Sequence, residues 1–577
     1  MSNVLNGGEF IVKNTPSNQI FIVEDFTEDQ SMMKDAVTEF IDREVWPHKA
    51  RFEKKDYAFT EELMQKAGDM GFLSIAVPES YGGMGMSFMS TILVCDYISG
   101  ASGSFATAYG AHTGIGTMPI VLYGTEAQKQ QYVPKLASGE WFGAYCLTEP
   151  GAGSDANSGK TKAVLTEDGK HYKISGQKMW ISNAGFCSLM IVFARIEDDK
   201  NLTAFIVEYD SENTNGIVLG DEEKKLGIRS SSTRQVFFNE TLVPVDNMLS
   251  DRQNGFKIAL NILNIGRIKL ASATLDSSRR VITNAVVYAN ERKQFGLAIS
   301  KFGAVQEKLA LMTTKNFVTE SGTYRAAGAI QQKIDELVAS GVSHQEAELK
   351  GVEDFALECA ILKVYASEVG QYVADEGLQI FGGMGFSEDT PMESAWRDAR
   401  ISRIYEGTNE INRLLTIGML LKKGLKGQID LMTPAMAVAK DLMGMPSFDT
   451  PDYSVLFTEE KEILDKLKKA FLMIAGKAVE KFGMGLERQQ ELVLCAADIL
   501  IEIYMAESTL LKTEKLVANS SENDSTLQIA MTKLNLFNAV EIISSKGKEA
   551  IISFTEADEQ RMLLMGLKRF TKYANYP

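Results

Sequence analysis

The feature that most limits the fold of this chain is a long stretch without proline. No proline occurs between Pro244 and Pro391, and the stretch carries helical patterns such as "LASATLDSSRRVITNAVVYANERKQF" and "EDFALECAILKVYASEVGQYVADEGLQIF". Because proline breaks helix interiors, its absence permits helices of many turns. Consecutive long helices favour a packed bundle, and we predict a four-helix bundle over residues 247–423.

The segments before this bundle show two different periods. Residues 1–139 are mainly helical in pattern. Residues 140–246 contain short β-branched and aromatic runs such as "SLMIVFARI" and "TRQVFFNE", and Asp168-Gly169 is typical of a hairpin turn. We therefore expect a helical domain followed by a β-barrel-like domain.

Behind the bundle, residues 424–456 contain Met, Pro and Gly, and helical patterns return over residues 457–577. The first segment is predicted to be a linker that includes an amphipathic helix, and the second a further helical domain. The expected fold is α+β, mainly α, in the order helical, β, helical, helical.

Composition excludes several classes of function. A formal net charge of −16 disfavours nucleic-acid binding, which depends on Lys and Arg contacts to phosphates. Five widely spaced cysteines and four histidines encode neither a disulfide framework nor a metal site. No apolar run approaches the roughly 20 residues that span a bilayer, and the N-terminus lacks a secretory or transit pattern, so we expect a cytoplasmic protein.

Two segments of the β domain could contact a planar or anionic ligand. The segment "YCLTEPGAGSDANS", residues 145–158, runs from a strand into a loop of small residues that lets backbone N–H groups approach a ligand. In "KMWISNAGFC", residues 178–187, strand alternation places Trp180 and Ser182 on the same side, a flat ring beside a hydroxyl. Taken alone, the first segment is better explained as an ordinary glycine-rich loop, and the second as a buried tryptophan with a turn serine.

Three segments of the bundle are equally ordinary in isolation. "ERKQFG" (residues 291–296) suits a helix C-terminus, "LQIFGGMGF" (residues 378–386) suits a helix that ends at Gly382, and Glu406 in "RISRIYEGTNEINR" (residues 400–413) suits an acid before a helix.

In combination and in this order, the five segments resemble the acyl-CoA dehydrogenase family from about residue 28 to 421. The C-terminal helical segment makes the chain more similar to the very-long-chain members, which carry such an extension. The resemblance implies FAD as cofactor, fatty acyl-CoA as substrate, dehydrogenation to trans-2-enoyl-CoA in the first step of fatty acid β-oxidation, an electron-transferring flavoprotein as electron acceptor, and a homodimer that shares the FAD sites.

The resemblance also assigns roles residue by residue. The cofactor-binding positions that it implies are Tyr145, Leu147, Thr148, Gly153, Ser154, Trp180, Ile181, Ser182, Arg292, Phe295, Gln306, Gln379, Ile380, Phe381, Gly382, Gly383, Thr408, Asn409 and Glu410. The substrate-binding positions are Ser154, Asn264, Gly266, Arg267, Tyr405 and Gly407. Many relatives have threonine where this chain has Ser182, and the hydroxyl is retained.

Glu406 matches the catalytic carboxylate that removes the α-proton of the acyl thioester. A carboxylate out of contact with water has a raised pKa and accepts a proton more readily, which suits this task. The resemblance further implies that the backbone N–H of Glu406 binds the thioester oxygen.

Several alternatives stay open at this stage. An acyl-CoA oxidase-like enzyme would pass electrons to oxygen, and a catalytically silent member would act as an assembly or scaffold protein; a DNA-associated branch is disfavoured by the acidic balance. We expect medium to long acyl chains. In "LMTPAMAVAKDLM" we expect a helix that Thr433 caps, with Pro434 at its first position. It carries the stripe Met432, Met436, Ala439 and Met443, with Leu431, Ala435, Val438 and Leu442 beside it. This pattern indicates a connector helix and leaves open a weak peripheral membrane contact.

Overall fold

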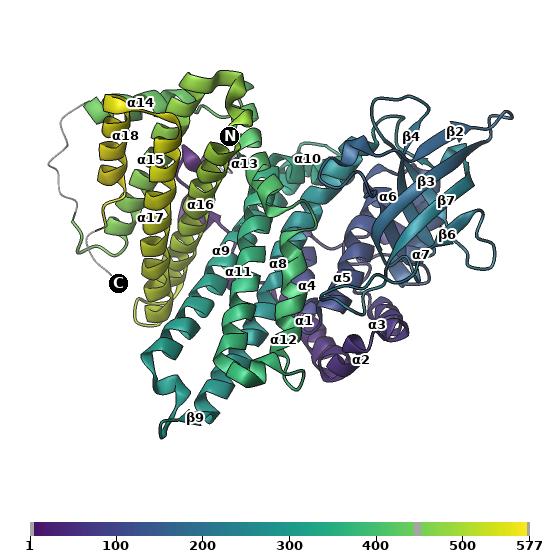
Figure 1. Cartoon of the computed structure of the whole chain (residues 1–577), viewed down its shortest axis with the longest axis horizontal. Helices are drawn as coiled ribbons and strands as arrows, with labels where there is room; N and C mark the ends of the chain where they lie inside the picture. Colours follow the sequence, from purple (N-terminus) through teal and green to yellow (C-terminus); the bar gives the residue numbers. More distant parts are fainter. Residues whose placement is uncertain (1–4, 444–451, 574–577) are drawn as a thin grey trace.

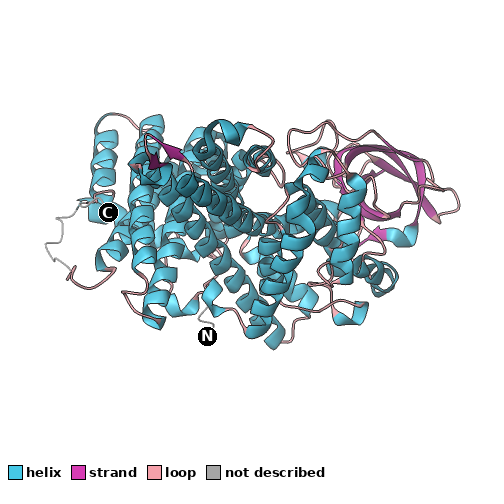
Figure 2. Cartoon of the chain, turned by 90° about the horizontal axis from the view of Figure 1, so that it is seen from below, coloured by secondary structure: helices cyan, strands magenta, loops and turns pink. Residues whose placement is uncertain are grey.

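The computed structural model describes residues 5–443 and 452–573 and confirms the predicted order helical, β, helical, helical (Figure 1). Residues 1–4, 444–451 and 574–577, which fall in the predicted first domain, linker and last domain, lie outside the described residues. The strands of the large sheet gather at one end of the molecule, and helices form most of the rest (Figure 2). None of the described helices is both long and apolar enough to cross a membrane.

Seven α-helices form the first helical unit, and hydroxyl caps begin several of them. The Thr27 and Thr125 side chains each accept a hydrogen bond from the backbone of the first turn. The helices are α1 (Glu28–Phe40), α2 (Lys49–Glu53), α3 (Tyr57–Asp69), α4 (Phe88–Ile98), α5 (Gly103–Gly110), α6 (Met118–Tyr123) and α7 (Glu126–Ser138). Between α5 and α6 lies a wide turn, η7 (Ala111–Gly116), which faces the interior.

The β unit is one eight-stranded sheet. Its strands are β1 (Gly143–Cys146), β2 (Lys162–Leu165), β3 (His171–Ser182), β4 (Leu189–Ile196), β5 (Thr203–Glu208), β6 (Ile217–Leu219), β7 (Thr233–Pro244) and β8 (Met248–Leu249). The order is β6-β7-β3-β2-β4-β5-β8, and β1 pairs in parallel with β4. The predicted hairpin joins β2 to β3, with Gly169 in a left-handed conformation.

The proline-free stretch forms the long helices that the sequence predicts. They are α8 (Gly255–Glu291), α9 (Gly303–Ala339) and α11 (Ala356–Phe381), with the shorter α10 (His344–Asp354) before α11 and a two-stranded ribbon of β9 (Lys293–Gln294) and β10 (Leu297–Ala298) after α8. Helices α12 (Met392–Ala399) and α13 (Asn409–Leu425) follow Pro391. Helix α11 packs on α8, α9 and α13 and forms the centre of the bundle. It ends at Gly382, as predicted.

The last helical unit comprises α14 (Met432–Met443), α15 (Thr458–Phe482), α16 (Gln490–Asn519), α17 (Thr526–Phe554) and α18 (Ala557–Phe570). Helix α16 packs on α9 and α13 and so joins this unit to the bundle. Helix α14 lies on α15 with Val438 buried, whereas Met432 and Met436 are 62% and 60% exposed. The side chain of Met443 lies outside the described part of the chain.

The N-terminal segment, residues 5–26, connects the bundle to the last helical unit. The Gly8 N–H donates to Glu358 of α11 at 2.6 Å, and Lys515 of α16 donates to the Ile20 carbonyl at 2.8 Å. The Phe10 ring packs edge-on against Tyr504 of α16. The segment therefore lies between two units that are both far from it in sequence.

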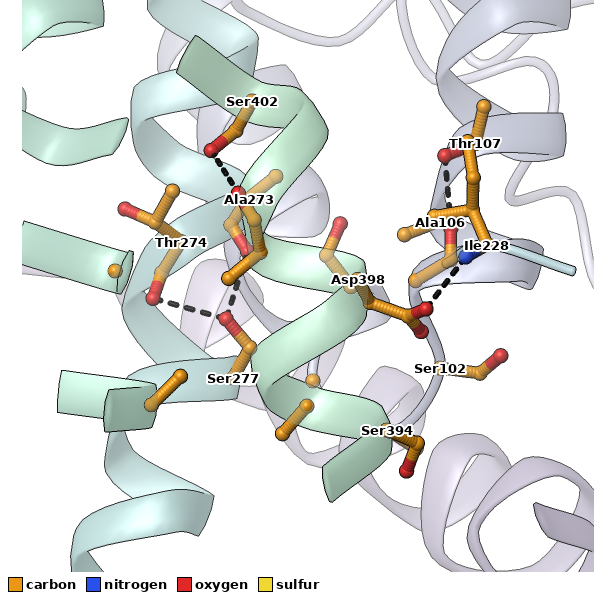
Figure 3. Close-up of a pocket in the computed structure, with 18 of the residues that line it drawn as sticks. Ser102, Ala106, Thr107, Ile228, Ala273, Thr274, Ser277, Ser394, Asp398 and Ser402 are labelled. Atoms are coloured by element: carbon orange, nitrogen blue, oxygen red, sulfur yellow. Dashed lines mark hydrogen bonds between the residues drawn. The ribbon is translucent and has the colours of Figure 1, made fainter. Parts of the chain in front are cut away.

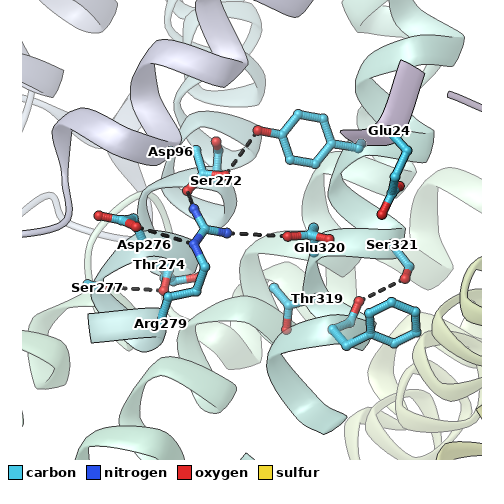
Figure 4. Close-up of polar contacts among 12 residues, drawn as sticks. Glu24, Asp96, Ser272, Thr274, Asp276, Ser277, Arg279, Thr319, Glu320 and Ser321 are labelled. Atoms are coloured by element: carbon cyan, nitrogen blue, oxygen red, sulfur yellow. Dashed lines mark hydrogen bonds and ion pairs between the residues drawn. The ribbon is translucent and has the colours of Figure 1, made fainter. Parts of the chain in front are cut away.

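A largely buried charge network connects the first helical unit, the bundle and the last helical unit, and Figure 4 shows its members around Arg279. Arg279 of α8 forms ion pairs with Asp96 of α4 and Glu320 of α9, and Lys512 of α16 contacts Glu320 at 2.5 Å. Burial raises the pKa of Asp96 to about 7, although the Arg279 charge opposes this rise. Loss of one member would leave its partner charge buried and unpaired, so the network favours a fixed arrangement of these four helices.

Candidate active site

A cavity of about 470 Å³ lies between the first helical unit and the bundle. Small side chains from the α4–α5 connection and from α5 form one wall, among them Ser102, Ala106 and Thr107, and the segment around Ser394 and Asp398 closes another side (Figure 3). Such residues leave space beside the backbone, so the fold itself creates the volume.

One face of α8 forms the longest wall. Its lining positions follow the 3.6-residue period of a helix, and they include Gly266, Leu270, Ala273, Ser277 and Asn284. The Ser277 hydroxyl donates to the carbonyls of Ala273 and Thr274 (Figure 3). Because these backbone carbonyls accept the hydrogen bond, the hydroxyl leaves no free O–H donor facing the cavity.

Glu406 lies beside the Gly266 end of the α8 wall, in a turn before α13. Its φ is +59° and that of Gly407 is +84°, so two successive residues adopt the left-handed conformation. A Cβ on Gly266 would lie 2.7 Å from Glu406 Oε2, so the carboxylate fills the space that a side chain at Gly266 would need. Within residues 5–443 and 452–573, this buried Oε2 atom has no hydrogen-bond partner.

Burial raises the pKa of Glu406 to about 7, while the positive charges of Arg267 and Lys363 oppose the rise. Burial and the nearby Glu406 charge together raise the phenol pKa values of Tyr145 and Tyr405, the latter to about 12. A carboxylate with a pKa near neutrality and a free oxygen atom can accept a proton from a bound molecule. The raised pKa that the sequence reasoning expected for a shielded Glu406 is therefore present.

The predicted substrate positions on α8 surround this turn. Arg267 is buried, its Nη1 donates to Asn264 Oδ1 at 2.7 Å, and its Nε donates to the Glu406 carbonyl at 3.3 Å. Gly266, Tyr405, Glu406 and Ser182 line the cavity, whereas Gly153 and Ser154 lie exposed in the loop after β1.

The segment that includes Tyr145, Leu147 and Thr148 leaves β1, and buried polar contacts hold its backbone in place. The Lys178 ammonium is fully buried and donates to Glu149 at 2.7 Å and to the Leu147 carbonyl at 3.3 Å. Glu149 accepts in turn from the Lys160 and Thr161 backbone N–H groups. These contacts hold the path of the loop.

Trp180, Ile181 and Ser182 end β3, but the alternation assumed from the sequence is interrupted. Trp180 has φ of +60° at a register shift between β3 and β7 and is 53% exposed. Ile181 is buried and Ser182 reaches the cavity. A bulge of this kind redirects side chains, so alternation cannot give the directions of Trp180 and Ser182.

The other predicted cofactor positions form a second cluster at the far end of α8 and α11. Arg292, Phe295 and Gln306 are exposed, Phe295 at 94%, and the Phe381 ring stacks on Tyr288 of α8 at 4.1 Å. The ribbon that begins at Lys293 lies well away from the large sheet in both views (Figures 1 and 2). One chain therefore does not bring this cluster together with the β1 loop. The remaining members of the cluster are Gln379, Ile380, Gly382 and Gly383.

The positions after the turn begin α13. Thr408 caps this helix by accepting from the Ile411 N–H, Asn409 is buried, and Glu410 is exposed. Asn409 accepts from Lys363 of α11 at 2.8 Å. Sequence reasoning missed Lys363, because "ILKVYASE" is typical of a helix with a solvent-facing lysine. It also missed Lys178, because the interpretation of "KMWISNAGFC" rested on Trp180 and Ser182 and gave the lysine no role.

Comparison with known proteins shows to which family the chain belongs. The chain belongs to the acyl-CoA dehydrogenase family: the family's N-terminal domain matches residues 27–140, its middle domain residues 144–241, and its C-terminal domains residues 253–420 and 466–569.

Three relatives illustrate the likeness. A probable acyl-CoA dehydrogenase of Bacillus subtilis is 40% identical over 99% of this chain and 95% of that protein. The human very long-chain specific acyl-CoA dehydrogenase, mitochondrial, is 39% identical over 67% of this chain and 58% of that protein. A crystal structure of an acyl-CoA dehydrogenase complexed with FAD from Bacillus anthracis superposes with a TM-score of 0.95 at 39% identity, and covers 99% of this chain and 96% of that chain.

Proposed function

We propose that this chain catalyses the FAD-dependent α,β-dehydrogenation of fatty acyl-CoA to trans-2-enoyl-CoA. The observation that carries the proposal is the Glu406 carboxylate, whose buried Oε2 has no hydrogen-bond partner among the described residues and lies next to the cavity wall at Gly266. A base in this position suits abstraction of a weakly acidic proton next to a thioester carbonyl.

The residues of the chain account for the proton transfer. Glu406 Oε2 would take the α-proton, the electron pair of that C–H bond would form the new double bond, and the β-hydrogen would leave with its own electron pair. With a pKa of about 7, Glu406 is deprotonated in a large fraction of molecules at neutral pH and still binds the proton firmly. Shielding from water strengthens the binding of the proton, because burial disfavours the charged carboxylate.

The β1 loop and the end of β3 fit a flavin. Trp180 presents an exposed ring in a strained backbone conformation, and the buried Tyr145 hydroxyl has no partner among residues 5–443 and 452–573. Leu147, Thr148 and Ser182 would hold the ring. When bound there, FAD supplies the acceptor for the β-hydrogen.

The second cluster supports a homodimer. Arg292, Phe295 and Gln306 are exposed at the opposite end of the bundle, and so are Gln379, Gly382 and Gly383, whereas Ile380 and Phe381 are buried. The exposed residues could hold the pyrophosphate and adenine of FAD bound mainly by a second copy. Phe295, which is 94% exposed at this end, would be covered by the second copy in a homodimer.

The cavity supports medium to long acyl chains. Its α8 wall runs from Gly266 to Asn284 and is roughly 27 Å long at the helical rise per residue. An extended chain of single bonds advances about 1.2 Å per bond, so the wall can follow roughly twenty bonds. A wall of this length suits a long chain better than a short one.

Two other readings of the same fold give different outcomes in assays. An oxidase-like enzyme would form peroxide during turnover, whereas we propose transfer to an electron-transferring flavoprotein. A silent scaffold member would not reduce its flavin with any acyl-CoA, and the free Glu406 oxygen argues against it. A cytoplasmic location and weak peripheral membrane contact through α14 stay predictions.

Replacing Glu406 by Gln tests the function directly. An amide cannot accept the proton, so the holoenzyme should keep its yellow flavin and bind acyl-CoA but lose bleaching of the flavin by substrate. A series of acyl-CoAs from four to twenty carbons with a dye acceptor gives the chain length. Bleaching by the Glu406→Gln variant at a rate close to that of the unaltered enzyme would reject Glu406 as the base.

A further inference from the structure

Lys363 is a buried lysine that the proposed chemistry has not used. It lies on α11 with a side chain that is fully shielded from solvent. Its Nζ donates to the Gly407 carbonyl at 2.6 Å and to Asn409 Oδ1 at 2.8 Å. Burying an ammonium group costs several kcal/mol unless it is well paired, so its contacts define what the residue does.

The turn that Lys363 contacts is strained. Glu406 is a non-glycine residue with φ of +59°, a conformation that costs roughly 1–3 kcal/mol and persists where the surroundings fix it. Three side chains from three helices bind the carbonyls of this turn. Arg267 of α8 contacts the Glu406 carbonyl, Lys363 of α11 contacts that of Gly407, and Asn412 of α13 contacts both, at 3.3 and 2.8 Å respectively.

The same lysine supplies charge to the site. Four ionisable groups face the Glu406 carboxylate: Arg267 of α8, Lys363 of α11, Tyr145 of β1, and the adjoining Tyr405. The two cations favour the ionised carboxylate, and burial disfavours it. Burial likewise lowers the pKa of Lys363 to about 7, against the attraction of Glu406. The two groups therefore titrate as a coupled pair.

We infer that Lys363 is a positioning residue for the proposed dehydrogenation: it fixes the Gly407 carbonyl, which holds the strained turn, and it places a positive charge near the Glu406 carboxylate. The inference rests on the proposed function, because it assigns Lys363 a role through Glu406. Lys363 lies on α11, whereas Glu406 lies in the turn before α13, so two elements of the fold would contribute to the proposed base.

The test measures kcat/KM against pH for the FAD-loaded enzyme with a dye acceptor. Activity should rise with pH as Glu406 loses its proton, with a midpoint near 7 in the unaltered enzyme. Lys363→Gln keeps a hydrogen-bond donor and removes the charge, so its midpoint should rise by about 0.5–1 pH unit. Lys363→Met removes both, so it should show the same rise and a plateau at least 10-fold lower.

Lys512→Met is the matched control. Lys512 is equally buried and paired with Glu320, but it lies on α16, outside the site. Its loss should reduce thermal stability without moving the midpoint. If Lys363→Met fails to fold, the Lys363→Gln midpoint decides.

An unmoved midpoint in Lys363→Gln would overturn the inference, even if the variant were less stable. The Glu406→Gln enzyme, measured in parallel, separates this failure from failure of the proposed function. If Glu406→Gln still bleaches with substrate, the proposed base is wrong. If it is inactive and the Lys363 variants keep the midpoint near 7, only the role of Lys363 is rejected.

Discussion

Adding one methyl group at Gly266 tests the geometry of the base without altering its chemistry. A Cβ at this position would lie 2.7 Å from Glu406 Oε2 and 2.9 Å from its carboxyl carbon. Both atoms belong to the end of a flexible side chain, so the carboxylate should move and the helices should stay. To reach an ordinary contact of 3.4 Å, the oxygen must shift by about 0.7 Å.

A displacement of this size should lower the rate of flavin reduction by substrate roughly 10- to 100-fold, equivalent to about 1.4–2.7 kcal/mol in the activation barrier. Stability should not fall, because alanine is favoured over glycine in a helix by roughly 0.5–1 kcal/mol. Flavin content and the melting temperature should therefore match those of the unaltered enzyme while stopped-flow reduction slows.

Gly418→Ala is the control for this experiment. Gly418 lies on α13, and no described atom is within 4 Å of a Cβ built there, so the variant should reduce its flavin at the normal rate. Normal reduction by Gly266→Ala as well, with Glu406→Gln inactive, would refute the inference that the carboxylate must occupy the position next to Gly266.

Three further predictions concern the flavin site and α14. Ser182→Ala should weaken the binding free energy of the flavin, or raise the activation barrier for its reduction, by roughly 1.5–3 kcal/mol. Unchanged flavin affinity together with an unchanged reduction rate would remove Ser182 from the site. Lys178→Met should lower the free energy of unfolding by about 3–5 kcal/mol and release flavin, because it leaves Glu149 buried and unpaired; Lys178→Met with Glu149→Leu should recover part of the loss, measured by thermal unfolding. Replacing Met432 and Met436 by Ser should leave dye-coupled activity intact, and reduced sedimentation with anionic liposomes would show that α14 contacts membranes.

Local patterns predicted the architecture well. The proline-free stretch became the long helices α8, α9 and α11, and Asp168-Gly169 became the turn between β2 and β3. Helix period, proline and turn glycines act within a few residues, so the sequence carries them directly.

The sequence led to a proposal for the site residues but could not give their geometry. The resemblance named Glu406, yet the carbonyls of its left-handed turn accept hydrogen bonds from Arg267, 139 positions from Glu406, and from Lys363, 44 positions from Gly407. Contacts at that separation leave no periodic signal, and a lysine on a helix more often faces water. The direction of Trp180 was missed for a different reason, because a bulge broke the strand alternation.

Helix α14 shows the same limit. The methionine stripe led the prediction, but Val438 and its neighbours Ala435 and Leu442 turn toward α15 and α18, while Met432 stays exposed. The first turn of the helix is stabilised by Asp430, which accepts from the Thr433 N–H, and not by a Thr433 cap. An apolar stripe gives the existence of a buried face, but its neighbours decide which residues form it.

The position of residues 5–26 constrains how the molecule can be made in a cell. Ile20 binds Lys515, and Phe10 packs on Tyr504, so these early residues meet their partners only after nearly all of the chain has left the ribosome. At roughly 5–20 residues per second, the apolar side chains of this segment wait about half a minute to two minutes without their final cover. During that interval they are accessible to chaperones, and the closure of the last helices over them completes the fold.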